Sequence, residues 1–139
     1  MTVATGYSGT PLTKKLGIKP GFHISLIGEP TDYVSSMLND LPNNIHWHKN
    51  FDTPDLDMIH IFVMNRALYA EILTQAKRVI KKSGTIWVSW PKKTSGIPTD
   101  VSENIIRSIA LEMGLVDVKV CAIDGVWSGL KLVYRLKDR

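Results

Sequence analysis

The chain has 139 residues, 44% of them hydrophobic and 22% charged, with a net charge of +4 and one cysteine. This composition predicts one folded domain and argues against disorder, and a single cysteine excludes a disulfide within the chain and favours a reducing, cytoplasmic location. No apolar run is long enough to cross a membrane, residues 1–9 lack the pattern of a secretory signal, and the mild positive charge permits an acidic ligand or partner without requiring nucleic acid.

The first half of the chain predicts two helices and three strands. Apolar runs bounded by glycine or proline mark the strands, and small polar residues before apolar stretches mark the helix starts. The expected elements are a helix over Pro11–Leu16 capped by Thr10, a strand over Phe22–Ile27, a helix from Thr31 or Asp32 to Leu41, and strands over Ile45–Lys49 and Met58–Met64.

The second half predicts two longer helices and three strands. Asn65 caps a helix over Arg66–Lys82, whose expected apolar stripe is Leu68, Ile72, Ala76, Val79 and Ile80, and Ser83-Gly84 ends it. The remaining elements are a strand over Thr85–Trp90, a helix that starts near Asp100 and Glu103 with Val101, Ile105, Ile109 and Met113 on its core face, and strands over Leu115–Ile123 and Gly129–Leu136.

Strands that alternate with helices pair in parallel through right-handed crossovers. The last two strands are joined by only a few residues, which favours an antiparallel hairpin. The sequence therefore predicts a single Rossmann-like, three-layer α/β domain over residues 1–139, with a mostly parallel sheet of about six strands and a C-terminal antiparallel hairpin.

Two resemblances accompany this prediction. The lead-in Leu16–Gly21, the segment Lys81–Gly84 before a strand, and the final helix followed by a hairpin are similar to class I S-adenosylmethionine methyltransferases with a shortened middle. Longer stretches, namely Gly6–Leu12, Trp87–Lys93, Val118–Cys121 and Trp127–Lys131, resemble an uncharacterised bacterial family, domain of unknown function 3052. That second resemblance implies a Rossmann-like fold and no particular activity, cofactor or catalytic residue.

The segment after the fourth predicted strand, Thr85–Trp90, is the leading candidate for a binding site. Ligands of open α/β sheets bind beyond the carboxyl ends of the strands, and Pro91 ends this strand. The expected ligand-binding residues are Trp90 and Trp127 as walls, Lys92 and Lys93 as charges, and Thr94, Ser95 and Thr99 as hydrogen-bonding groups. This set predicts a non-catalytic binding module for a small anionic ligand or an acidic partner, although a solvated loop and a hydrophobic plug at Trp127 are the alternatives.

The methyltransferase resemblance implies a different function, S-adenosylmethionine-dependent methyl transfer, with Gly28, Asp52 and Asn65 near the cofactor. The sequence departs from that pattern in two places. The turn Gly28-Glu29-Pro30 has one glycine instead of three, and the second strand ends in basic residues where an acidic residue is expected. Asn65 has the alternative role of a helix cap.

The histidine, cysteine and serine residues give weaker indications of function than the segment after Trp90. His46 and His48 lie on one face of a strand and form a possible metal pair without a third ligand, so no metal site is expected. His23 and His60 fall within apolar strands, as does Cys121, and are interpreted as core groups. No serine nucleophile motif or phosphate-binding loop occurs, so no catalytic residue is assigned, and weak nucleic-acid binding through the scattered basic residues remains a third possible function.

Overall fold

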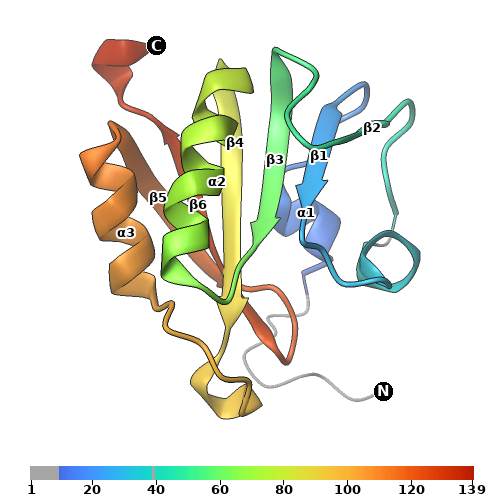
Figure 1. The fold of residues 1–139 in the computed structure, drawn as a ribbon. Coiled ribbons are helices and arrows are strands. Elements are labelled where there is room, and N and C mark those ends of the chain that lie inside the picture. Colours follow the sequence, from blue (N-terminus) through green and yellow to red (C-terminus); the bar gives the residue numbers. More distant parts are fainter. Residues whose placement is uncertain (1–9, 39) are drawn as a thin grey trace.

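The computed structural model describes residues 10–38 and 40–139. Six strands form one sheet in the order β2-β1-β3-β4-β6-β5 (Figure 1). The first four strands in this order run parallel, and β6 is antiparallel to both of its neighbours. The strands are β1 His23–Ile27, β2 His46–Lys49, β3 Leu56–Phe62, β4 Ile80–Pro91, β5 Leu115–Ala122 and β6 Trp127–Tyr134. The predicted mixed sheet with a C-terminal hairpin is confirmed.

Helices lie on both faces of this sheet. Figure 1 shows α2, Arg66–Val79, and α3, Glu103–Glu112, together on one face, and α1, Leu12–Leu16, on the other. Two buried clusters result, one between the sheet and the α2/α3 pair and one beneath α1. No helix in residues 10–38 and 40–139 has the length and apolar character needed to cross a membrane.

The buried face of α2 differs from the predicted stripe by a rotation of about one residue. Tyr69, Leu73 and Ala76 are fully buried, whereas Leu68 is 50% exposed. The hydroxyl of Tyr69 donates a hydrogen bond to the backbone carbonyl of Ile106 on α3, 2.9 Å away. The buried side of α2 packs in the cluster between the sheet and the α2/α3 pair, and the bond to α3 gives the polar tip of Tyr69 a partner inside this core.

Helix α3 shows the same kind of shift. Ile106 and Ala110 are its fully buried residues, while the predicted Ile105, Ile109 and Met113 are only partly covered. Its N-cap is Ser102, whose side chain accepts from the Ile105 backbone N–H at 3.4 Å.

The end of α2 was also predicted wrongly. The helix stops at Val79, and Ile80 already pairs with Leu56 on β3. Gly84 lies inside the long strand β4, where an added Cβ would come within 3.0 Å of the Asp57 carbonyl oxygen. The glycine is thus required by the close approach of β3 and does not end the helix.

The helix predicted from Thr31 or Asp32 to Leu41 is wrong as well. In the described part of this stretch, residues 31–38 and 40–41, the helical structure is one π-helical turn, Tyr33–Met37, and the chain is extended at Leu38. The Asp32 side chain makes no capping hydrogen bond, and Asp40 has a left-handed φ of 56°, which an α-helix cannot accommodate. Tyr33 is buried in the core, so its contacts with residues distant in the sequence take the place of the predicted local helix.

Candidate functional site

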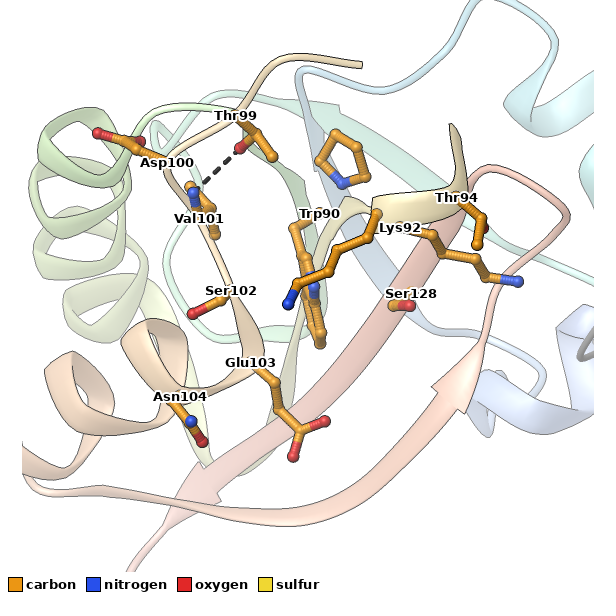
Figure 2. Close-up of a pocket in the computed structure, with 12 residues that line it drawn as sticks. Trp90, Lys92, Thr94, Thr99, Asp100, Val101, Ser102, Glu103, Asn104 and Ser128 are labelled. Atoms are coloured by element: carbon orange, nitrogen blue, oxygen red, sulfur yellow. Dashed lines mark hydrogen bonds between the residues drawn. The ribbon is translucent and has the colours of Figure 1, made fainter. Parts of the chain in front are cut away.

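A cavity of about 690 Å³ opens at the carboxyl end of β4, between the start of β6 and the start of α3 (Figure 2). Pro91 pairs with Trp127 of β6, and the Lys92 N–H donates to the Val126 carbonyl at 2.8 Å, so the chain leaves the sheet in a fixed direction. The lining residues are Trp90, Pro91, Lys92, Lys93, Thr94, Thr99, Asp100, Val101, Ser102, Glu103, Asn104 and Ser128. We call this cavity the Trp90 pocket.

Five of the seven residues predicted to bind a ligand line the Trp90 pocket: Trp90, Lys92, Lys93, Thr94 and Thr99. Ser95 instead shapes the loop, because its hydroxyl donates to the Lys92 carbonyl at 2.6 Å and accepts from the Ile97 N–H at 3.2 Å. Trp127 packs on the opposite face of the sheet against Phe62, with ring centroids 5.1 Å apart.

Ser128 is a lining residue that the sequence analysis missed. It lies directly opposite Trp90 in the β4–β6 ladder, and successive residues of a strand point to opposite faces. Trp127 therefore faces the core beneath α1 while Ser128 faces the pocket. The register between two strands is the signal that identifies Ser128, and that register is not visible from either strand alone.

One wall of the Trp90 pocket is tied to the start of α2. The Thr99 hydroxyl donates to the Met64 carbonyl at 2.7 Å, and the Asp100 carboxylate accepts from the Arg66 N–H at 2.8 Å. The Val101 N–H in turn donates to the Thr99 hydroxyl at 3.1 Å, the bond drawn in Figure 2. Thr99 and Asp100 thus hold the loop in place as well as lining the pocket.

The acidic and basic side chains at the Trp90 pocket differ in whether they have ion-pair or hydrogen-bond partners. Glu103 forms an ion pair with Arg107 at 2.6 Å, and Arg107 also contacts Asp117 at 3.0 Å. The Asp100 carboxylate is occupied by the Arg66 N–H. Since both acidic groups have partners while the exposed Lys93 forms no ion pair with any described residue, the pocket offers positive charge to a ligand.

The three residues of the methyltransferase alternative follow three adjacent parallel strands. Gly28 directly follows β1, Asp52 lies just beyond β2, and Asn65 lies just beyond β3. The chain runs from β1 to β2 on one side and to β3 on the other, so the topological switch point lies between β1 and β3. In open α/β sheets, ligands bind at this point. We call the three residues the switch-point edge.

Each of the three has a defined environment. Gly28 has φ +70°, and a Cβ there would lie 2.7 Å from the Phe62 carbonyl oxygen, so only glycine fits. The Asn65 side-chain oxygen accepts from the Leu68 N–H at 2.9 Å, which confirms its capping role and leaves its amide nitrogen as a donor. Asp52 is exposed and has no hydrogen bond or ion pair with any residue in the described part of the chain.

This donor set fits the nucleoside half of S-adenosylmethionine. An exposed carboxylate at Asp52 can accept from ribose hydroxyls, and Met64, 51% exposed beside Asn65, offers an apolar surface to a purine ring. The fit does not extend to the glycine-rich turn, because Gly28 is followed by Glu29 and Pro30 and its Cβ direction is filled by β3.

The histidines form a group that the sequence did not anticipate. His23 stacks on His46 at 4.3 Å between ring centroids, and its Nδ1 lies 2.8 Å from Nε2 of His48. At this distance one of the two nitrogens donates a hydrogen bond to the other. Among the residues described, no set of three or more histidine, cysteine, aspartate or glutamate side chains is arranged to hold a metal ion.

His60 is a core group, as predicted, whereas Cys121 is only partly buried against the cluster beneath α1. His60 is fully buried and bonded on both sides, to the Tyr33 hydroxyl and to the Ser89 hydroxyl, each at 2.7 Å. Burial lowers the pKa of His60 to about 3, so the ring is neutral. Burial also raises the pKa of the Cys121 thiol, although Lys15 and Lys119 oppose this, so Cys121 has no sign of an activated nucleophile.

The fold is that of class I S-adenosylmethionine-dependent methyltransferases. A methyltransferase from Aquifex aeolicus superposes with a TM-score of 0.64 at 17% identity, over 87% of this chain and 86% of that one. A precorrin-6y C5,15-methyltransferase from Geobacter metallireducens gives 0.60 at 14% identity, over 89% and 86%. A tRNA methyltransferase from B. subtilis gives 0.55 at 16% identity, over 93% and 67%.

These comparisons define the class of fold and leave the activity open. No protein-family model matches the chain, so domain of unknown function 3052 remains a resemblance, and no curated protein matches it. At such low identity, the shared fold does not transfer a reaction.

Proposed function

We propose that this chain binds S-adenosylmethionine at the switch-point edge and transfers its methyl group to a small anionic acceptor held in the Trp90 pocket. The fold shared with methyltransferases over most of both chains supports the cofactor, and the exposed Asp52 carboxylate, beyond the strand next to β1, supports its location at the switch-point edge. The pocket with its two lysines supports an anionic acceptor.

The observation that carries this proposal is the physical link between the two places. Thr99 and Asp100 of the pocket wall bond to Met64 and Arg66, the two neighbours of Asn65. A ligand in the Trp90 pocket and a ligand at the switch-point edge would therefore both border the braced segment Met64–Arg66, which would bring the two reactants to one place. Such bracing is what orientation of two reactants requires.

Each group has a role in this proposal. Asp52 and the Asn65 amide nitrogen would hold the nucleoside, and S-adenosylmethionine would supply an electrophilic methyl group on its sulfonium. Lys92 and Lys93 would attract the acceptor, and Trp90 and Ser128 would orient it. No catalytic base is assigned, because the pocket holds no histidine and both of its carboxylates have partners.

Calorimetry with S-adenosylmethionine and S-adenosylhomocysteine tests the cofactor site. We expect saturable heat with the native chain and about tenfold weaker binding in Asp52→Asn, which loses a charged acceptor. Asp55→Asn is the matched control, since Asp55 is exposed in the same turn and its φ of 57° suits asparagine. Absence of heat at millimolar ligand would remove the proposal.

A second candidate function is binding without catalysis, and the pocket itself favours it. The Trp90 pocket has its volume and its lysines whether or not a cofactor binds elsewhere. Thermal shift with inorganic phosphate and small carboxylates tests it. We expect a rise in melting temperature that Lys92→Ala/Lys93→Ala abolishes and Lys14→Ala/Lys49→Ala, at two exposed lysines elsewhere, retains. Equal shifts in both double variants would argue against a site at this pocket.

A further inference from the structure

Residues 10–38 and 40–139 cover only part of the sheet face that carries α1. The cluster beneath α1 and the π-helical turn involves β1, β3, Trp87 of β4 and the ends of β5 and β6 near Ile123 and Trp127. Beyond it, two cavities of about 380 and 330 Å³ lie side by side and share Ser83, Gly84, Thr85 and Lys131. They form one groove, the basic groove, over the amino-terminal part of β4 and the middle of β6. Its other lining residues include Lys19, Lys82, Val118, Val133 and Arg139.

Positive charge is concentrated at this groove without local compensation. Lys131 lines both cavities, and Lys119 borders the groove because it lies directly opposite Lys131 in the β5–β6 ladder. Like charges in that position repel each other. Within the described residues, Lys19, Lys119 and Lys131 form no ion pair.

The acidic residue of the groove does not change this balance. Asp57 is already bonded to Lys81 at 2.7 Å and to the His23 N–H at 2.8 Å. Partial burial raises the pKa of Asp57, but these bonds more than offset that effect and hold it below its ordinary value. The arrangement is electrostatically complementary to an anionic partner.

The apolar part of the groove indicates which kind of anion fits. Val118 is 54% exposed on β5, and Val133 lies half-buried on the neighbouring strand β6. Grooves for single-stranded nucleic acid combine cations with aromatic rings on which bases stack. Among the described residues that line this groove, Phe22 is the one aromatic side chain and is half-buried, so aliphatic contacts dominate.

We propose that the basic groove binds an extended acidic peptide segment of a partner protein, with its carboxylates at Lys119 and Lys131 and its aliphatic side chains at Val118 and Val133. The groove lies toward the end of the sheet opposite the Trp90 pocket, because Ser83–Thr85 lie in the amino-terminal part of the strand that Pro91 ends. This binding is independent of the proposed methyl transfer, and either can fail without the other.

The test measures fluorescence anisotropy of a labelled peptide of alternating glutamate and valine, at low and moderate salt. We expect saturable binding whose Kd rises about tenfold or more in Lys119→Glu/Lys131→Glu, because attraction becomes repulsion at both positions. Lys14→Glu/Lys49→Glu changes the net charge equally at exposed sites outside the groove and should leave the Kd within about twofold. The variant Lys119→Gln/Lys131→Gln removes the repulsion between the two lysines without adding negative charge. Weaker binding in this variant is therefore not explained by a folding defect.

Three outcomes would overturn the proposal. The first is no binding at millimolar peptide. The second is equal weakening in the groove and control variants, which would show attraction by net charge alone. The third is tighter binding of a single-stranded DNA of equal charge, with a Kd that rises steeply with salt, which would assign the groove to nucleic acid.

Discussion

The hydroxyl of Tyr33 lies 2.7 Å from Nδ1 of His60, inside the layer between the sheet and the π-helical turn. Nε2 of the same ring lies 2.7 Å from the Ser89 hydroxyl. Each ring nitrogen therefore has one partner, and the chain Tyr33–His60–Ser89 crosses β3 and β4 without an unsatisfied polar atom. A buried network in which every member is bonded rigidifies a core and makes each member costly to remove.

The neutral state of His60 predicts a pH dependence of stability. Its pKa falls from an ordinary 6.5 to about 3 through burial, so between these values the unfolded chain binds a proton that the folded chain does not. Stability should therefore fall as the pH decreases below 6.5, with a slope of up to about 1.4 kcal/mol per pH unit from this residue. Urea unfolding of native and His60→Gln chains between about pH 6 and about pH 4 checks it, and equal slopes would contradict it.

Removing one hydroxyl from the network should destabilise the fold. Ser89→Ala leaves a buried nitrogen of His60 without a partner, and we expect a loss of about 1–3 kcal/mol in the free energy of unfolding. Ser108→Ala, at an exposed position of α3, is the control and should change the free energy by less than about 0.5 kcal/mol. Similar urea midpoints for the two variants would show that the His60 bond contributes little.

Gly28 and Gly96 differ in one respect that a pair of alanine substitutions can measure. Both have a left-handed φ, +70° and +75°, but an added Cβ meets the Phe62 carbonyl at 2.7 Å only at Gly28. Gly96→Ala should cost about 1 kcal/mol for the backbone conformation alone. Gly28→Ala should cost about 2 kcal/mol more, because β1 or β3 must shift. Equal thermal unfolding temperatures would show that the turn relaxes freely.

The register of α2 gives a further test. Leu73 is fully buried and Leu68 is 50% exposed, so Leu73→Ala should cost about 2–5 kcal/mol and Leu68→Ala less than about 1 kcal/mol. Chemical denaturation of both variants measures the difference. The opposite ranking would favour the helical face predicted from the sequence pattern.

Leu68 and Leu73 show a feature that the sequence pattern alone does not decide, namely which face of α2 is buried. Leu68, Ile72 and Ala76 form a valid helical stripe, and so do Tyr69, Leu73 and Ala76. The second stripe is the one that packs in the core between the sheet and the α2/α3 pair, where the Tyr69 hydroxyl also bonds to Ile106 on another helix. The Trp90 pocket likewise has features that the sequence predicts and features that depend on tertiary structure. Proline and paired lysines after a buried strand located it, whereas Ser128 and the bracing by Thr99 required knowledge of strand register and loop position.

By itself the sequence determined the class of fold, the order of most elements and the loop at which the pocket opens, because apolar periodicity, glycine and proline act over a few residues. Tertiary structure decided the lengths of α2 and β4, the loss of the helix near Tyr33, the grouping of His23 with His48 and the open groove around Lys131. Each of these features depends on which segments, distant in the sequence, come into contact. The free energy of a buried hydroxyl, of a hydrogen bond between two histidines or of an unpaired charge is set by those contacts.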